Sequence, residues 1–115
     1  MNTALTFDNL ARANAIRLPL FKNAKGELAH AQDDWSINDW AVALAGEVGE
    51  LCNLLKKVRR GDFTLREAKV EISSEIGDIQ IYLDLLATKC EINLGQATRF
   101  SFNQKSIDKK IEVFI

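Results

Sequence analysis

The sequence predicts an all-α protein, a four-helix-type bundle built around one long antiparallel hairpin, and three observations lead to this prediction. Apolar residues recur every three or four positions through residues 36–60 and again through 64–89, which is the period of an amphipathic helix. Each segment opens on a capping-box pattern, "SIND" at Ser36 and "TLRE" at Thr64. Only the tight "GDF" turn separates them, so the two helices should fold back on each other.

The remaining elements flank this hairpin. Residues 5–18 carry apolar side chains roughly on one side, which predicts an amphipathic helix that stops near Pro19, the only proline. Residues 21–35 mix glycine, charge and the only histidine without a convincing period, so we expect mostly loop. The second hairpin helix should run through Lys89. A last helix should start near Asn93, where "NLGQ" can cap it, and continue to the last few residues.

Length, composition and charge narrow the function classes. The 115 residues predict one helical domain, residues 1–115. A formal net charge of −1 gives no basic footprint for a nucleic-acid polymer. The N-terminus lacks the apolar run of a signal peptide, and nowhere are there eighteen consecutive apolar residues for a membrane span. Cys52 and Cys90 lie in apolar helical patterns, which favours reduced thiols in a cytoplasmic protein.

Four acidic residues stand in the middle of the two hairpin helices, in "EVGE" and "EIGD". Glu47 and Glu50 are three residues apart on the first helix, and Glu75 and Asp78 are three apart on the second. Each pair belongs to a stripe that borders an expected core stripe. These core stripes are Leu44, Val48, Leu51 and Leu55 on the first helix and Ile72, Ile76, Ile79, Leu83 and Leu86 on the second. Antiparallel pairing brings the helix middles together, so the four carboxylates should converge at one level.

Converging carboxylates in a partly desolvated place raise one another's pKa or destabilise the fold unless a cation compensates their charge. No lysine or arginine falls at that level on either stripe, so a metal ion is the simplest compensating charge. Ligation by oxygen alone favours a hard cation, Mg²⁺ or Mn²⁺, over zinc. One such acid pair is often only a solvated helix face. Two pairs on neighbouring helices favour a metal centre.

Three glycines accompany the acids, at Gly46, Gly49 and Gly77. Each costs about 1 kcal/mol relative to alanine in a helix interior. Backbone without a side chain lets a neighbouring helix or a ligand come close. We therefore expect such a close approach beside the acids.

The motif "EVGE", followed after twenty-four intervening residues by "EIGD", resembles the ExxE…ExxD signature of the MazG-type all-α nucleoside triphosphate pyrophosphohydrolases. This group includes the dCTP pyrophosphatases and the dimeric dUTPases. The stretches "ALAGEVGELCNLLKK" and "EIGDIQIYLDLLA" resemble single-domain MazG-like proteins, over about residues 35–102. The resemblance implies nucleotide-pool cleaning, by hydrolysis of a nucleoside triphosphate to the monophosphate and pyrophosphate. It also implies that Glu47, Glu50, Glu75 and Asp78 hold Mg²⁺.

The resemblance extends to residues around the acids. Glu50 is our choice for the group that takes the proton of the attacking water, although spacing alone does not rank the four acids. Tyr82 stands where relatives use an aromatic residue in the substrate pocket, and the alternative is a core tyrosine with a wet hydroxyl. Trp35 could stack on a base, whereas Trp40 is expected in the core. His30, alone in its loop, is expected to be incidental.

Contacts with the substrate's phosphates are less well specified. Lys56 and Lys57 could reach phosphates, or could simply complement the dipole at the end of their helix. Relatives often carry a Lys-aromatic-Asn segment on the last helix, but this chain reads "SFNQKS". Ser101 replaces the lysine, and Asn103 remains as a residue that could contact substrate.

Two function classes remain, together with an expected assembly. Retention of all four acids and of Tyr82 favours the enzyme, whereas the missing lysine favours a non-catalytic helical interaction module that binds a cation or a basic partner. The helix over 64–89 is apolar on nearly all sides, which predicts cover by a second subunit. We therefore expect a homo-oligomer, a dimer or a tetramer, with nucleotide pockets near the interface, as the resemblance also implies. The preferred base depends on pocket shape.

Overall fold

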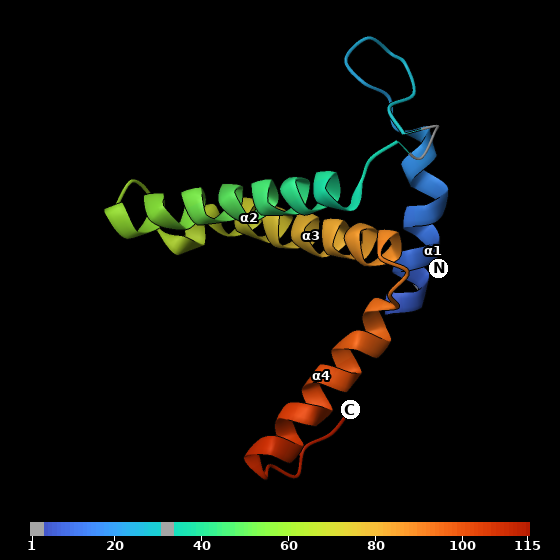
Figure 1. Ribbon diagram of the computed structural model, residues 1–115. Helices are drawn as coiled ribbons and strands as arrows, with labels where there is room; N and C mark the ends of the chain where they lie inside the picture. Colours follow the sequence, from blue (N-terminus) through green and yellow to red (C-terminus); the bar gives the residue numbers. More distant parts are fainter. Residues whose placement is uncertain (1–3, 31–33) are drawn as a thin grey trace.

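A computed structural model describes residues 4–30 and 34–115 of the chain (Figure 1). The described residues form four α-helices and one turn of 3₁₀ helix: α1 Phe7–Arg17, η1 Leu18–Leu20, α2 Ile37–Arg60, α3 Leu65–Lys89 and α4 Leu94–Lys109. Within these ranges no strand forms, apart from an isolated antiparallel bridge between Lys22 and Leu28. The all-α prediction is confirmed. None of the described helices combines the length and apolarity needed to cross a membrane.

The hairpin helices begin and end at the residues that the sequence indicates. The Ser36 hydroxyl accepts a hydrogen bond from the Asp39 N–H at 3.1 Å, and the Asp39 carboxylate accepts one from the Ser36 N–H at 2.8 Å. Thr64 and Glu67 form the same reciprocal pair at the start of α3, at 3.2 and 3.0 Å. Gly61 ends α2 with a φ of 90°, a left-handed conformation that glycine adopts at little cost. Both capping boxes and the tight turn are confirmed.

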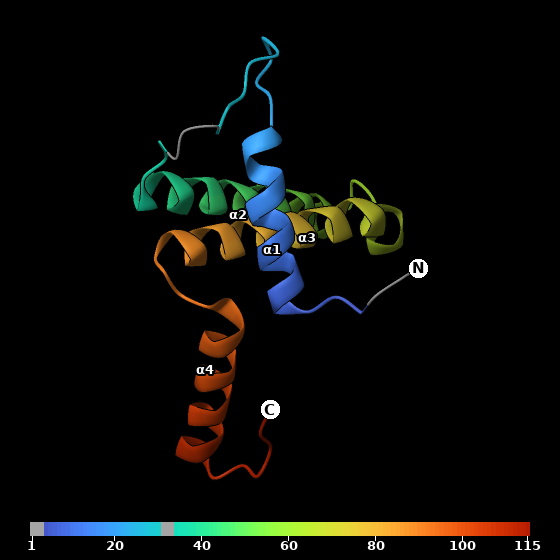
Figure 2. The same ribbon diagram turned by 90° about the vertical axis from the view of Figure 1, so that its right-hand side faces the viewer.

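Helices α2 and α3 lie side by side along their length, while α1 crosses one end of the hairpin and α4 leads away from it (Figures 1 and 2). A buried polar contact attaches α1: the Asn14 amide donates to Asp84 Oδ2 at 2.8 Å and to the Ile81 carbonyl at 3.3 Å. At Gly95 in α4 an added Cβ would lie 3.1 Å from the Phe7 Cβ, so α1 and α4 meet closely there. One chain by itself therefore leaves most of the hairpin uncovered.

The single chain buries little apolar surface. Among the described residues, the apolar side chains that are buried belong to Trp40, Ala68, Ile72 and Ala87. The accessible surface is 8977 Å², whereas a compact monomer of this mass exposes about 6,300 Å². The radius of gyration is 17.2 Å, against about 13 Å for a compact domain of this length. The chain is thus more extended than a compact domain of this length.

The structure corrects the expected core stripes. Val48, Leu55 and Ile76 were expected in the core, yet they are 40%, 43% and 54% exposed. The adjoining stripe of α2 is half-buried instead, including Glu47 and Leu54. The contact face of each helix is rotated toward its acids, since among the described residues α2 and α3 pack mainly against each other. The acids therefore lie at the contact between the helices, and part of each expected core stripe faces outward.

The glycines beside the acids have no close neighbour from another element in the described part of the chain. A Cβ added at Gly46, Gly49 or Gly77 would have no atom within 4 Å. The close approach that we expected at these positions is therefore not made by another described part of the same chain. That a ligand or a second copy of the chain approaches these glycines stays a prediction.

Candidate metal centre

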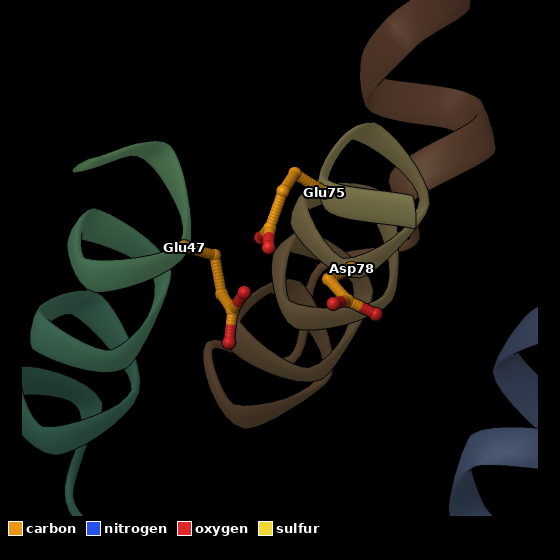
Figure 3. A group of neighbouring side chains, drawn as sticks. All are labelled: Glu47, Glu75 and Asp78. Atoms are coloured by element: carbon orange, nitrogen blue, oxygen red, sulfur yellow. The ribbon is translucent and has the colours of Figure 1, made fainter. Parts of the chain in front are cut away.

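Three carboxylates meet halfway along the hairpin. Glu47 projects from α2 toward α3, where Glu75 and Asp78 lie one turn apart (Figure 3). One carboxylate oxygen from each of the three lies within 4.8 Å of the others. Antiparallel pairing around the Gly61 turn places these positions at the same level, as the spacing predicts. Three of the four acids singled out by the sequence are thereby brought together.

The cluster contains polar atoms that the described part of the chain does not satisfy. The Oε2 atoms of Glu47 and Glu75 are buried and accept no hydrogen bond from the described residues. Buried polar atoms are almost always paired, because an unpaired one loses its hydration without compensation. Two such unpaired oxygens thus lie in one cluster, at the level where the sequence predicts a cation.

The pKa values of two acids in the cluster are raised. The pKa of Glu47 is raised to about 7, mainly because burial removes solvation from its carboxylate and then because Glu50, Asp78 and Glu75 are negative. The pKa of Glu75 is also raised, by burial first and then by its hydrogen bond to Glu50 and the charges of Glu50 and Asp78. Burial and neighbouring negative charge thus act in the same direction on both carboxyls. A bound divalent cation would compensate the neighbouring charge.

Glu50 and Tyr82 stand at the edges of the cluster. Glu50 is exposed and lies outside the group of three, yet its charge raises the pKa of both Glu47 and Glu75. Tyr82 is half-buried, and its pKa is raised by burial and then by Glu47, Asp78 and Glu50. All four acids therefore act as one electrostatic unit, with Glu50 on its solvent side and Tyr82 beside it.

A cavity of about 440 Å³ opens beside the acids, between α1, η1, the loop that follows them, α2 and α3. Glu47 and Asp78 contribute to its wall, and so do His30, Trp40 and Tyr82. This volume lies within the range of small-molecule sites in proteins, about 300–1,000 Å³. The acid cluster thus borders a space large enough for part of a small organic molecule.

Aromatic rings form a connected group at this cavity. The ring centres are 4.7 Å apart for His30 and Trp35, 4.6 Å for Trp35 and Trp40, and 6.1 Å for Trp40 and Tyr82. Trp40 is only 4% exposed, which confirms the expectation that it belongs to the core. Trp35 lies against it and lines a smaller neighbouring cavity. His30, expected to be incidental, instead links the loop to this group.

The lysines proposed for phosphate binding lie elsewhere on the hairpin. Lys56 and Lys57 are near the turn, where they add to the lowering of the Asp62 pKa that the hydrogen bond from Arg60 mainly causes. Along α2 they lie roughly 13–15 Å beyond Glu47, at 1.5 Å per residue. The structure does not bring them to the cavity.

Asn103 is engaged within the C-terminal part of the chain. Its side-chain amide donates to the Ile115 carbonyl at 3.0 Å and accepts from the Ile115 N–H at 2.9 Å. Asn103 lies on α4, which leads away from the hairpin (Figure 1). Within one chain the Asn103 amide therefore holds residues that follow α4. The acid cluster lies on α2 and α3 instead.

Sequence reasoning missed two cations of the cavity. Arg17, at the end of α1, and Lys22, in the following loop, both line it together with Glu47 and Asp78. No spacing in the sequence relates residues 17 and 22 to the acids, which begin twenty-five positions later. Only the crossing of α1 over α3 brings them near.

Comparisons with known proteins add no relative: no family model, no curated protein and no solved structure matches this chain. The functional assignment therefore depends on the four-acid motif and on the geometry of the cluster and its cavity.

Proposed function

We propose that this protein is a MazG-like, Mg²⁺-dependent nucleoside triphosphate pyrophosphohydrolase, for which Mn²⁺ can replace Mg²⁺. The observation that carries the proposal is the cluster of Glu47, Glu75 and Asp78 beside an aromatic-walled cavity. The unpaired buried oxygens of the cluster support a bound cation, and the cavity has room for part of an organic substrate. The four-acid motif relates both to nucleotide hydrolysis.

The donor set fits a hard divalent cation. Carboxylate oxygens from Glu47, Glu75 and Asp78, with Glu50 at the solvent side, are the ligands that Mg²⁺ and Mn²⁺ prefer. When bound, such a cation neutralises phosphate charge and makes a coordinated water more acidic. The protein's part is to hold the four carboxylates at one level and to keep Glu47 ionised once its neighbours are compensated.

The chemistry that we assign to the chain is an in-line attack of water on the α phosphorus. A bond forms between the water oxygen and the α phosphorus, and the bond from that phosphorus to the bridging oxygen breaks, so pyrophosphate leaves. Glu50 takes the proton of the water, because it is the acid with the most solvent access and lies beside Glu47 and Glu75. His30 and Tyr82, both half-buried at the cavity, provide aromatic surface for the base.

A second copy of the chain is part of this proposal. The excess accessible surface, between about 2,000 and 3,000 Å² per chain, is comparable to the area that each subunit loses in a large obligate interface. Val48, Leu55 and Ile76 on the hairpin add exposed apolar side chains to that surface. We propose a homo-oligomer in which a second hairpin covers them and completes the bundle.

A product assay tests the activity. Purified protein with Mg²⁺ is incubated with a panel of canonical and modified nucleoside triphosphates, and pyrophosphate and orthophosphate are measured separately. We expect monophosphate and pyrophosphate from at least one nucleotide, and none from Asp78→Asn, with Glu71→Gln on the exposed part of α3 as the control. Release of orthophosphate, or equal activity in Asp78→Asn, would contradict the proposal. Metal binding without hydrolysis of any nucleotide would favour a helical interaction module.

A further inference from the structure

The cavity beside the acid cluster has a positively charged wall that α2 and α3 do not supply. It consists of Arg17, in the last turn of α1, and Lys22, in the loop after η1. We propose that this wall, Arg17 and Lys22, binds the phosphates of the substrate's triphosphate chain. The inference depends on the proposed function, because it assigns phosphate contacts within the same cavity.

The position of Arg17 is fixed relative to the acids. Asn14, one turn earlier in α1, is 4% exposed and donates its amide to Asp84, which is 2% exposed, at 2.8 Å. The same amide donates to the Ile81 carbonyl at 3.3 Å. Ile81 and Asp84 follow Asp78 within two turns of α3. A buried polar contact thus ties α1 to the part of α3 that carries the cluster.

The position of Lys22 is fixed by its loop. The Lys22 backbone forms a bridge with Leu28, and the Ala29 N–H donates to the Phe21 carbonyl at 2.8 Å. The Arg17 guanidinium stands 5.3 Å from the centre of the Phe21 ring. The segment after η1 is therefore folded on itself, and both cations belong to one local unit beside the cavity.

Charge explains why the cavity needs these residues. A nucleoside triphosphate is a polyanion, and divalent cations that compensate the carboxylates leave part of its charge unbalanced. Without further cations, that charge would face Glu47 and Asp78 across the cavity. Arginine presents a planar fork of donors that matches phosphate oxygens, and lysine provides a point charge. Of the described residues that line this cavity, Arg17 and Lys22 are the ones with this chemistry.

Charge-removing variants with matched controls test the inference. Arg17→Met and Lys22→Met keep an aliphatic stem on side chains that are exposed, so the fold should tolerate them. Arg12→Met in α1 and Lys25→Met in the loop remove the same charges outside the cavity wall. Calorimetry measures binding of Mn²⁺ alone, of a deoxynucleoside triphosphate with an α,β-imido link in the presence of Mg²⁺, and of the corresponding monophosphate.

We expect each cavity variant to lose triphosphate affinity by about tenfold or more, while Mn²⁺ affinity stays within about threefold and the controls match the wild type. Arg17→Lys should recover part of the loss. Equal weakening of triphosphate and monophosphate, or triphosphate affinity unchanged in both variants, would overturn the inference and leave the proposed function standing. A wild type that binds neither Mn²⁺ nor the triphosphate would overturn both.

Discussion

Replacing Glu47 by glutamine should stabilise the metal-free protein above about pH 7 and change little near pH 4. The native state raises the pKa of Glu47 from 4.5 to about 7. Native Glu47 therefore keeps its proton up to about pH 7, whereas the unfolded chain releases it near pH 4.5. Unfolding releases a proton between these values, so the free energy of unfolding falls as the pH rises through this window.

The size of the effect follows from the same shift. At about 1.4 kcal/mol per pKa unit, a shift of this size corresponds to at most about 3 kcal/mol. The cluster is only half-buried, so solvent screening reduces this to about 1–2 kcal/mol. For a domain of this length that is roughly 4–10 °C in melting temperature. Glutamine keeps the shape of the side chain and removes the charge that its three neighbours repel.

Thermal unfolding measures this difference in stability. The experiment is done without metal, at one protein concentration and at several pH values between 4 and 8.5. Wild type should lose stability between about pH 4.5 and pH 7 more steeply than Glu47→Gln, and added Mg²⁺ at pH 8 should raise the melting temperature of the wild type more than that of the variant. Glu71→Gln, an exposed acid on α3, should follow the wild type. Parallel pH profiles for wild type and Glu47→Gln would refute the crowding of these carboxylates.

Further predictions concern the reaction, the metal, the assembly and the fold. Asp78→Asn should lower pyrophosphate release about 100-fold or more with an unchanged circular dichroism spectrum, and a smaller loss would count against its role in the cluster. Mn²⁺ affinity should rise between about pH 5.5 and pH 7.5, because Glu47 must lose its proton to bind; calorimetry that found no pH dependence would contradict this. Ile76→Lys should shift the mass measured by light scattering toward that of one 12.9 kDa chain, and an unchanged assembly would place the interface elsewhere. Asn14→Leu should lower the free energy of unfolding by about 2–4 kcal/mol, because Asp84 stays buried without its donor; a urea titration that found no loss would show that the pair is dispensable.

Local signals predicted the helices well. The reciprocal caps at Ser36 and Thr64 and the left-handed Gly61 are decided within a few residues, so their chemistry is readable from the sequence. The level at which Glu47 meets Glu75 follows from counting outward from that turn. These features depend on neighbours along the chain or on one simple pairing.

Other features depend on contacts that no local pattern encodes. Periodicity finds the apolar side of a helix but does not show which part of it faces the partner helix, so Val48 and Ile76 were wrongly expected in the core. The cavity is walled partly by α1 and its following loop, and the position of Arg17 depends on the buried contact of Asn14 with α3. Asn14 is one of two asparagines in a short helix, and nothing in the sequence marks it for such a contact.

The central claim is that the four acids hold a divalent cation, and Mn²⁺ binding followed by electron paramagnetic resonance tests it most directly. Free Mn²⁺ gives a strong signal that is lost on binding, so affinity and stoichiometry come from one titration at pH 7.5. We predict binding to the wild type and to Glu71→Gln, and a loss of at least tenfold in affinity for Glu47→Gln and for Asp78→Asn. Equal Mn²⁺ binding by all four proteins, or none by the wild type, would contradict the account.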